Sequence, residues 1–388
     1  MTGGHEAGLD AAAKQGLIQL IKDRIVKNGP IPFAEFMELA LYSPDGGYYA
    51  SAKSPWGGAG DYITNLDMGH GFPRTVTRQI IEMWEALGKG RFTLVEAGAG
   101  RGTLSAGILE TLRTQRHPLY DLIDAQLIDR TWDARAGKGI ETQDKVSWHT
   151  SLREIKPIKS GCIVSNELID SLPVHRVILR DAKLLEIHTD FGGSNFFDIP
   201  KEPSTDKLAQ YLKHGGIRLV EGQRAEINLD ATEWIKEAGA LIEKGFVITI
   251  DYGLPRRELY AAETGPTLHC HYRHTLNNDP YRHIGEQDIT SHVDFTALEA
   301  AGAASGLELT GFTTQKNFLL GLGILDELQN TDELTPANIE KINANRLIKD
   351  LIMPQSMGDT FKTLIQHKGI TKPALKGFSW RDMSRYLR

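Results

Sequence analysis

Three closely spaced glycines follow a short apolar run and are suited to bind a small molecule through the main chain. The segment reads VEAGAGRG over residues 95–102, in which Glu96 precedes Gly98, Gly100 and Gly102. Glycine lets the backbone turn sharply and lets a ligand approach it closely. The G-x-G-x-G spacing differs from the G-x-G-x-x-G of dinucleotide-binding folds. A dinucleotide site and a tight turn without a ligand are the alternatives to a site for another small molecule.

Acidic and amide side chains stand at the ends of two later strand-like runs. Asp129 ends the run 125–129, and an acid there can accept hydrogen bonds from both hydroxyls of a ribose. Asn166 and Glu167 end the run 162–167. Because ligands of open α/β sheets sit beyond the carboxyl ends of the strands, these groups indicate a site. A helix cap or a solvated strand end is the alternative for Asp129.

Four further positions belong to the same candidate site. Asp170 follows the fourth run, within LIDSLP, and Asp251 stands near the end of the run 246–253. A simple strand cap is the alternative for Asp251. Ser151 and Leu152 lie just beyond the third run, where an adenine ring usually packs, although a plain loop explains them equally well.

The elements that position these residues alternate between strands and helices. Expected strands are 91–96, 125–129, 145–149, 162–167, 246–253, 307–315 and 361–369, with a hairpin over 174–188. Expected helices are 11–28, 33–42, 74–88, 104–115, 294–304, 317–329 and 336–352. Strands separated by helical stretches predict a mostly parallel, doubly wound α/β sheet.

The composition excludes several classes of protein. The chain has 388 residues, of which 40% are hydrophobic and 24% are charged, an ordinary globular balance. Its formal net charge of −6 argues against a dedicated nucleic-acid binder, which usually shows a basic face. Two cysteines, Cys162 and Cys270, are interpreted as reduced thiols in a reducing compartment.

The N-terminal segment and the apolar runs predict the location of the protein. No apolar run approaches the roughly 20 residues that a transmembrane helix needs. The first residues include Glu6 and Asp10 without an apolar stretch, which fits neither a secretory signal nor an Arg-rich transit peptide. We therefore expect a cytoplasmic protein without a membrane span.

Other catalytic and metal-binding patterns are weak. Histidines and one cysteine gather in the last third of the chain: His269, Cys270, His271, His274, His283 and His292. Their spacing fits no standard zinc pattern, so we expect a polar loop and no metal. The sequence contains neither a G-x-S-x-G nucleophile elbow nor a G-x-x-x-x-G-K-[ST] phosphate loop.

Stretches along nearly the whole chain carry a resemblance to a known family. They are FAEFMELALY (33–42), GDYIT (60–64), VEAGAGRG (95–102), SNELIDSLPVHR (165–176), DYG (251–253), QDITSHVDF (287–295), TQKNFLLGLGI (314–324) and LIMPQSMGDTFKTLIQHKG (351–369). The Glu-x-Gly-x-Gly-x-Gly pattern by itself is typical of class I methyltransferases that bind S-adenosylmethionine. Taken together, the stretches resemble the MidA-like family, whose mitochondrial members are complex I assembly methyltransferases.

The resemblance implies a class I methyltransferase fold. This fold is a Rossmann-like α/β sheet, mostly parallel with one antiparallel strand, with a helical N-terminal lead-in and insertions. The expected division is a helical cap and flap loop over 1–90, a core over 91–185 and 241–388, and insertions at 186–240, 254–290 and 317–355.

The resemblance also implies S-adenosylmethionine as methyl donor and an arginine of a protein partner, of the respiratory complex I subunit type, as acceptor. The cofactor-binding residues are expected to be Glu96, Gly98, Gly100, Gly102, Asp129, Ser151, Leu152, Asn166, Asp61 and Thr64. We expect a protein substrate and a monomer or homodimer, with no nucleic acid and no metal. A non-catalytic assembly or binding factor that keeps the fold is the alternative.

Carboxylates are the expected catalytic groups. An arginine side chain stays protonated at neutral pH, with a pKa of about 13, so acids must hold it and localise its charge. Glu167, Asp170 and Asp251 are the acids expected at the strand ends. Asp67 is expected to approach from the N-terminal loop, at a position where the family usually carries a glutamate.

Overall fold

The structure is a computed structural model, and it describes residues 3–50, 65–131, 143–331, 336–354 and 356–388. The chain divides into two compact units. The first unit comprises Met1–Ile63, Asp170–Ala231 and Leu254–Asp294. The second unit comprises Thr64–Ile169, Thr232–Gly253 and Phe295–Arg388. Each unit is therefore built from three separate stretches of sequence.

The second unit contains a long, mostly parallel sheet. Its strands are β2 (Phe92–Ala97), β3 (Ile123–Ile128), β4 (Val146–His149), β5 (Gly161–Asn166), β10 (Gly245–Leu254), β15 (Glu308–Thr314) and β16 (Phe361–Lys368). They follow the order β15-β16-β10-β5-β2-β3-β4. Strand β16 is antiparallel to both of its neighbours, whereas β10, β5, β2, β3 and β4 run parallel. The expected doubly wound sheet with one antiparallel strand is confirmed.

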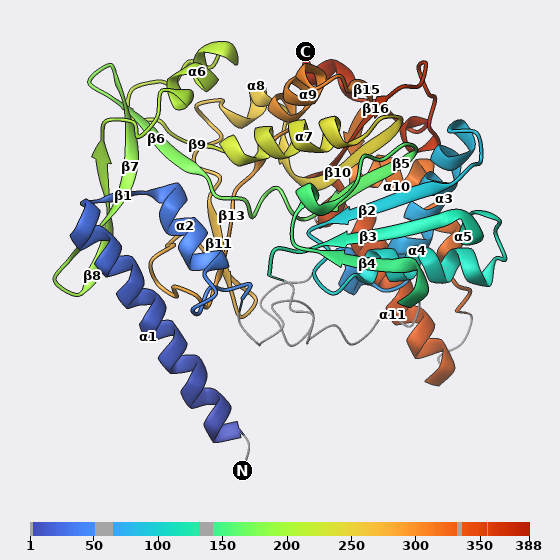
Figure 1. The fold of residues 1–388 in the computed structure, drawn as a ribbon, viewed down its shortest axis with the longest axis horizontal. Coiled ribbons are helices and arrows are strands. Elements are labelled where there is room, and N and C mark those ends of the chain that lie inside the picture. Colours follow the sequence, from blue (N-terminus) through green and yellow to red (C-terminus); the bar gives the residue numbers. More distant parts are fainter. Residues whose placement is uncertain (1–2, 51–64, 132–142, 332–335, 355) are drawn as a thin grey trace. The chain divides into compact units, whose positions relative to one another are not determined.

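Helices cover both faces of this sheet (Figure 1). They are α3 (Gly71–Ala86), α4 (Thr103–Thr114), α5 (Leu119–Leu122), α7 (Leu229–Leu241), α9 (Phe295–Ala304), α10 (Gln315–Gly321), α11 (Pro336–Ile352) and α12 (Met357–Thr360). Helices α3, α4, α10 and α11 share a core with one face of the sheet. Helices α7 and α9 lie against the other face, where Lys368 and Gln366 of β16 donate hydrogen bonds to carbonyls of these helices.

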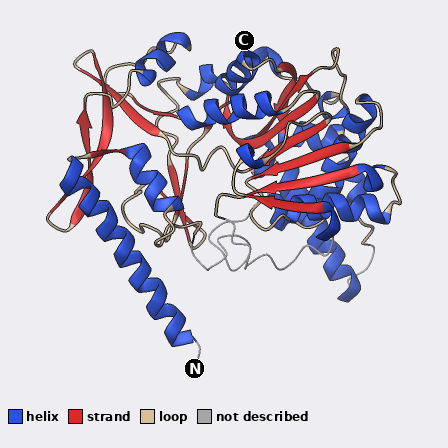
Figure 2. Ribbon diagram, viewed as in Figure 1, coloured by secondary structure: helices blue, strands red, loops and turns tan. Residues whose placement is uncertain are grey.

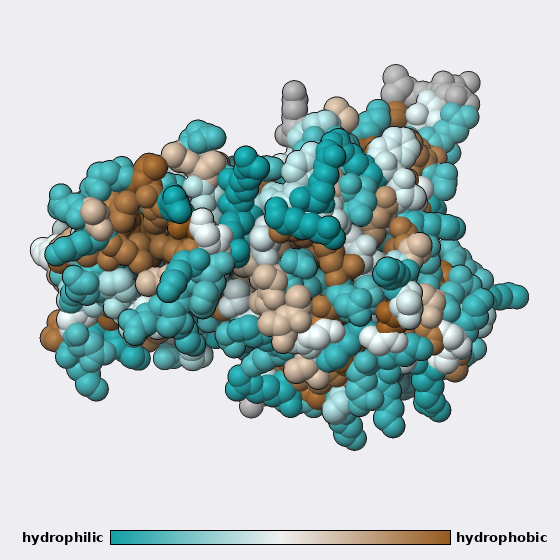
Figure 3. Space-filling model, turned by 90° about the horizontal axis from the view of Figure 1, so that it is seen from above, coloured by the Kyte–Doolittle hydropathy of each residue, from teal (hydrophilic) through white to brown (hydrophobic). Residues whose placement is uncertain are grey.

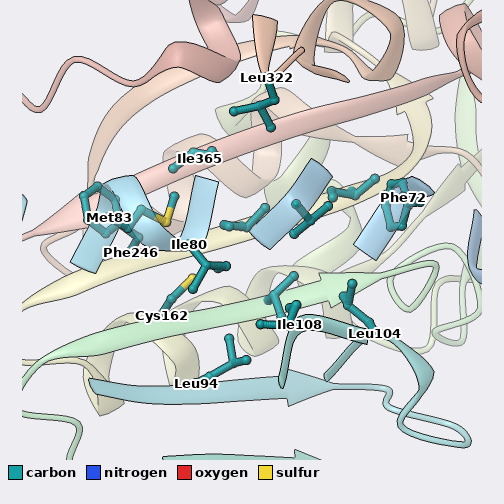
Figure 4. Packing of buried hydrophobic residues seen from close by; sticks show 14 of the residues in the cluster. Phe72, Ile80, Met83, Leu94, Leu104, Ile108, Cys162, Phe246, Leu322 and Ile365 are labelled. Atoms are coloured by element: carbon teal, nitrogen blue, oxygen red, sulfur yellow. The ribbon is translucent and has the colours of Figure 1, made fainter. Parts of the chain in front are cut away.

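Alternating side chains of the strands build the larger core. Phe246 and Ile248 of β10 and Cys162 of β5 pack against α3 and α4 (Figure 4). Helix α3 contributes Phe72, Ile80 and other apolar residues to the same cluster. We expected α3 within an N-terminal cap over 1–90, but its apolar face belongs to the core of the second unit.

The first unit is mainly antiparallel (Figure 2). Its strands are β1 (Ile31–Pro32), β6 (His175–Arg180), β7 (Lys183–Gly192), β8 (Asn195–Lys201), β9 (Arg224–Ile227), β11 (His269–Tyr272), β12 (Thr275–Asn277), β13 (Asp288–Thr290) and β14 (Val293–Asp294). One sheet runs β1-β7-β6-β9 with β8 on β7, and a smaller one runs β12-β11-β13. The helices are α1 (Gly3–Asn28), α2 (Phe33–Tyr42), α6 (Lys207–His214) and α8 (Arg256–Leu259), and α7 begins here before it continues into the second unit.

Several expected elements of the first unit form as predicted. The helix expected over 33–42 is α2, and the hairpin expected over 174–188 is β6–β7. Asp181 and Ala182 form its turn with positive φ angles of 52° and 58°. Strands β8, β9, β11, β12 and β13 were not anticipated, because each is short or lacks a clear alternation of apolar and polar residues.

The helices of the described residues do not meet the requirements of a membrane span. Within the described ranges, no helix combines the length and the apolar character that a bilayer crossing requires. Figure 3 shows one face of the molecule, where hydrophilic residues alternate with smaller hydrophobic areas.

Candidate functional site

The candidate site lies where the strand order of the large sheet reverses. From β2 the chain proceeds outward to β3 and β4, and it then returns to place β5 on the other side of β2. In open α/β sheets, ligands bind outside the carboxyl ends of the strands at such a switch point. The glycine loop follows β2, and Glu167 follows β5. The topology therefore brings two of the expected site segments to one place.

The glycine loop turns through three left-handed residues. Gly98, Gly100 and Gly102 have φ angles of +70°, +52° and +71°, values that other residues rarely adopt. A Cβ atom at Gly98 would lie 2.8 Å from Leu168 Cδ1, so the loop is packed directly against the residue after Glu167. Helix α4 begins at Thr103, immediately after the loop. These positions need glycine, as the sequence predicted.

Glu96 is buried beneath this loop. Only 3% of Glu96 is exposed, and its Oε2 accepts a hydrogen bond of 2.9 Å from the backbone N–H of Ser105 in the first turn of α4. Burial raises the pKa of this carboxyl from its ordinary value of 4.5 to about 7, while the bond from Ser105 acts in the opposite direction. Glu96 thus links the end of β2 to the first turn of α4.

Asp129 binds the glycine loop directly. Its Oδ2 accepts a hydrogen bond of 2.9 Å from the Gly100 N–H, and its Oδ1 accepts bonds from the N–H and hydroxyl of Thr131 at 2.9 and 2.7 Å. The Asp129 N–H itself donates to the carbonyl of His149, the last residue of β4. A carboxylate has about four acceptor sites, so these three bonds leave capacity for another donor.

Glu167 occupies a strained turn after β5. Its φ is +55°, and a non-glycine residue in this region costs about 1–3 kcal/mol and is often found at functional sites. The Glu167 N–H donates to the carbonyl of Ile250 at 3.0 Å. Its Oε1 accepts hydrogen bonds from the Asn65 N–H at 2.8 Å and from Asn166 Nδ2 at 3.0 Å. The carboxylate is therefore held at the rim by two N–H donors.

Two site residues were missed by the sequence analysis. Asn65 and Gln315 are fully buried; Asn65 binds Asn166 at the end of β5, and Gln315 binds Asn65. Asn65 Nδ2 donates to Asn166 Oδ1 at 3.0 Å, and Gln315 Nε2 donates to Asn65 Oδ1 at 2.9 Å. The only available signal was that Gln315 lies within the stretch TQKNFLLGLGI.

Asp251 is buried behind the turn. None of its surface is exposed, and its Oδ2 accepts hydrogen bonds from the N–H groups of Leu168 at 3.2 Å and Ile169 at 2.7 Å. Its Oδ1 accepts from the N–H of Tyr252 at 2.8 Å. These bonds are those of a cap, which was the alternative considered from the sequence. Asp251 therefore holds the backbone that follows Glu167.

The remaining expected site residues are less closely connected to this group. Leu152 is buried at the start of a 3₁₀-helix, Leu152–Glu154, and Ser151 caps it by accepting a bond from the Arg153 N–H at 3.3 Å. Asp170 belongs to the first unit, where it is buried and its carbonyl accepts from the Ser291 N–H at 2.9 Å.

Three expected residues fall wholly or partly outside the described structure. Asp61 and Thr64 lie outside the described residues. Asp67 lies in the 3₁₀-helix Asn65–Met68, of which the structure describes only the backbone at this position.

The histidine-rich segment forms strands instead of a loop. His269 and His271 lie on β11, and His269 Nδ1 is 3.1 Å from Asn278 Oδ1. In the part of the chain that the structure describes, no three His, Cys, Asp or Glu side chains are grouped as metal ligands.

The residues around the switch point fit S-adenosylmethionine. The left-handed glycines leave the main chain open to close approach, as a cofactor with a bulky adenosyl group requires. Three acids lie near the loop: Asp129 accepts from the Gly100 N–H, Glu96 accepts from Ser105 just after the loop, and Glu167 precedes Leu168, which packs against Gly98. Carboxylates accept hydrogen bonds from an ammonium group and from ribose hydroxyls, both of which this cofactor carries.

Comparisons with known proteins show which family the chain belongs to. The profile of the family of S-adenosyl-L-methionine-dependent methyltransferases matches residues 75–313. The protein arginine methyltransferase NDUFAF7 homolog, mitochondrial, of Drosophila melanogaster is 27% identical over 94% of this chain and 86% of its own length. The human protein arginine methyltransferase NDUFAF7, mitochondrial, is 26% identical over 89% and 82% of the two chains.

A solved structure extends the likeness to the whole fold. A protein from Burkholderia thailandensis, crystallised with S-adenosyl-homocysteine, superposes with a TM-score of 0.87 at 29% identity and covers 97% of both chains. The family profile spans more than half of the present chain and includes the glycine loop, Asp129, Glu167 and Asp251. The chain therefore belongs to the family of S-adenosylmethionine-dependent methyltransferases.

Proposed function

We propose that this methyltransferase modifies an arginine side chain of a protein partner, of the respiratory complex I subunit type. The observation that carries the proposal is the position of the Glu167 carboxylate. It follows β5 at the switch point, and the next residue, Leu168, packs against the glycine loop. The names of the relatives as protein arginine methyltransferases support this choice of acceptor.

In this proposal the loop and its neighbouring acids hold the cofactor. S-adenosylmethionine supplies a methyl group on a positively charged sulfur. The main chain at Gly100 and Gly102 receives the cofactor closely, because these residues carry no side chain to obstruct it. Gly98 completes the loop, and the missing side chain there makes room for Leu168. Asp129 accepts from the ribose hydroxyls while it also fixes the Gly100 N–H. Ser151, Leu152, Asn166, Asp61 and Thr64 stay predicted cofactor contacts.

Glu167 is the proposed contact for the arginine. A guanidinium presents N–H groups in a planar fork that matches a carboxylate, and the pair forms charge-assisted hydrogen bonds. The enzyme has to hold the acceptor nitrogen at near-attack distance, and a fixed carboxylate does so by orientation. The bonds from Asn65 and Asn166 fix the Glu167 carboxylate before any substrate arrives.

The other expected catalytic acids receive separate roles. Asp251 is proposed as a positioning residue, because its oxygens accept backbone N–H groups of the turn after Glu167. Asp170 and Asp67 stay candidates for substrate contacts. The cytoplasmic location and the monomeric or homodimeric state also stay predictions, and the relatives are named as mitochondrial proteins.

The test of this function identifies the product. The purified protein is incubated with S-adenosylmethionine tritiated at the methyl group and with total protein from cells that lack the gene. Hydrolysis to amino acids followed by chromatography should place the label on methylated arginine. Label on another amino acid would contradict the acceptor. Absence of label, despite cofactor binding measured by calorimetry, would favour a non-catalytic assembly or binding factor.

A further inference from the structure

A directional chain of three amide side chains ends on Glu167. It consists of Gln315, Asn65 and Asn166, which come from α10, a 3₁₀-helix and β5. We propose that Gln315 and Asn65 are positioning residues, because they determine which end of the Asn166 amide faces the Glu167 carboxylate. The inference rests on the proposed function insofar as Glu167 acts on the substrate.

The direction of the chain is anchored at a backbone carbonyl. Gln315 Nε2 donates to the carbonyl oxygen of Leu351 at 3.2 Å and to Asn65 Oδ1 at 2.9 Å. A carbonyl oxygen can only accept, so a flipped Gln315 would bring its own oxygen against that of Leu351. Gln315 Oε1 is buried without a hydrogen-bond partner among the described residues. The bond to the Leu351 carbonyl therefore keeps the Gln315 nitrogen in place.

The orientation of Gln315 passes along the chain to Glu167. Because Asn65 accepts through Oδ1, its Nδ2 faces the other way and donates to Asn166 Oδ1 at 3.0 Å. Because Asn166 accepts through Oδ1, its Nδ2 faces Glu167 Oε1 at 3.0 Å. Each amide has one accepting and one donating end, so the reversal of one reverses the next. In the reversed chain, an amide oxygen would face the carboxylate oxygen, and the two would repel.

Asn65 supports Glu167 in two ways. Its backbone N–H donates to Glu167 Oε1 at 2.8 Å, and its side chain orients Asn166. Asn65 and Gln315 are fully buried, so solvent does not compete for these bonds. The carboxylate at the rim is consequently held by elements that are far apart in the sequence.

The first test reverses the direction of the hydrogen bonds between the amide side chains with a nearly isosteric substitution. Gln315→Glu replaces the donating nitrogen with an oxygen, so Asn65 and then Asn166 should turn over. The rate of tritium transfer at saturating S-adenosylmethionine should fall at least about tenfold, as displacement of a positioned group commonly causes. S-adenosyl-homocysteine affinity, measured by calorimetry, should fall by a smaller factor than the transfer rate, because Asn166 is one of several predicted cofactor contacts and the glycine loop is unchanged.

Gln366 offers a matched control. It is buried on β16, its Nε2 donates to the Glu299 carbonyl at 3.0 Å, and its Oε1 has no hydrogen-bond partner among the described residues. Gln366→Glu therefore places the same carboxylate in a similar environment, away from Glu167. Transfer should fall much less in Gln366→Glu than in Gln315→Glu. Equal losses in the two variants would assign the effect to a buried charge and would overturn the inference.

A double-mutant cycle with Glu167→Gln tests whether Gln315 acts through Glu167. The amide of the Glu167→Gln variant has its own N–H, which can face a reversed Asn166 Oδ1. In the Glu167→Gln background, adding Gln315→Glu should therefore reduce the transfer rate by less than about twofold. The same change should reduce the rate at least about tenfold in the wild-type protein, so the two losses should not multiply. Multiplicative losses would overturn the positioning role. Full transfer in Glu167→Gln alone would contradict the proposed function of Glu167.

NMR measures the orientation of the Asn166 amide independently of methyl transfer. The side-chain amide signal of Asn166 should move in Gln315→Glu and stay in place in Gln366→Glu. The signal should move similarly in Asn65→Asp, which removes the donor to Asn166 and serves if Gln315→Glu does not fold. An unmoved Asn166 signal in a folded variant would contradict the proposed coupling between the amide side chains, whatever the transfer assay shows.

Discussion

The two sides of the switch point are built by different means. The loop after β2 depends on the main chain: three left-handed glycines, one buried acid beneath them and Asp129 on the Gly100 N–H. The turn after β5 depends on side chains brought together from α10, a 3₁₀-helix and β10. The first arrangement is largely local in sequence, whereas the second exists only after the sheet has formed. Cofactor binding and acceptor positioning should therefore respond separately to mutation.

The largest expected effect is on the main-chain side. Gly100→Val should abolish S-adenosylmethionine binding, because Gly100 has a φ of +52° and a β-branched residue is strained there. Its side chain would also fill the space of the ligand. Calorimetry measures the loss.

Gly88→Val is the matched control for this change. Gly88 also has a positive φ, +96°, and no atom lies within 4 Å of a Cβ placed there. The control should lose stability while it keeps cofactor affinity. Wild-type affinity in Gly100→Val would show that the loop does not receive the ligand.

The next effect is the pH dependence that Glu96 gives to the fold. Its pKa rises from 4.5 to about 7 on folding, so between these values the folded protein holds a proton that the unfolded chain releases. The contribution of Glu96 to the free energy of unfolding should therefore be most favourable below about pH 4.5, and it should fall as the pH rises through 7. The full contribution is about 3 kcal/mol at most.

Glu96→Gln should remove this slope, because the amide keeps an acceptor for Ser105 without titrating. Denaturant unfolding at a series of pH values between 4.5 and 7 measures it. Glu110→Gln, on the exposed part of α4, is the control and should leave the slope in place. A Glu96→Gln protein with the wild-type slope would show that another group titrates.

A smaller effect is expected at the edge of the loop. Asp129→Ala should weaken S-adenosylmethionine binding by about 1–3 kcal/mol, the range for hydrogen bonds that involve a charged group. Asp124→Ala, at an exposed position of β3, should leave affinity unchanged. Titration calorimetry compares the two. Unchanged affinity in Asp129→Ala would remove the ribose contact from this residue.

The main-chain side of the site could be predicted from the sequence. The glycine spacing and the strand-forming run before it locate β2, the loop and α4 within about two residues. The strand ending before Asp129 was placed as well, because parallel strands separated by helices bring their carboxyl ends to one edge. These features depend on backbone conformation, which neighbouring residues largely determine.

The side-chain half of the site could not be predicted in the same way. Nothing in the sequence connects Asn65 to Gln315, since their bond depends on how α10 and the 3₁₀-helix pack. Asp251 was expected at the rim because it stands near a strand end. Its neighbour Ile250 packs in the large core, so Asp251 points to the opposite face of the sheet, where it binds backbone N–H groups.

The domain division also depended on packing. Helix α3 was expected in an N-terminal cap, but Phe72 and Ile80 complete the core of the second unit. Amphipathic spacing shows that a helix has a buried face, and it does not show which partner covers that face.

The most direct test of the account is the ratio of methyl transfer to cofactor affinity in Glu167→Gln. The amide preserves the shape of the side chain and removes the charge that holds a guanidinium. We expect transfer to methylarginine to fall at least about 100-fold, the scale for losing one positioned electrostatic group, while S-adenosyl-homocysteine affinity stays within about threefold. A parallel loss of affinity would place Glu167 on the cofactor instead. Full transfer activity would contradict the central claim that Glu167 holds the acceptor.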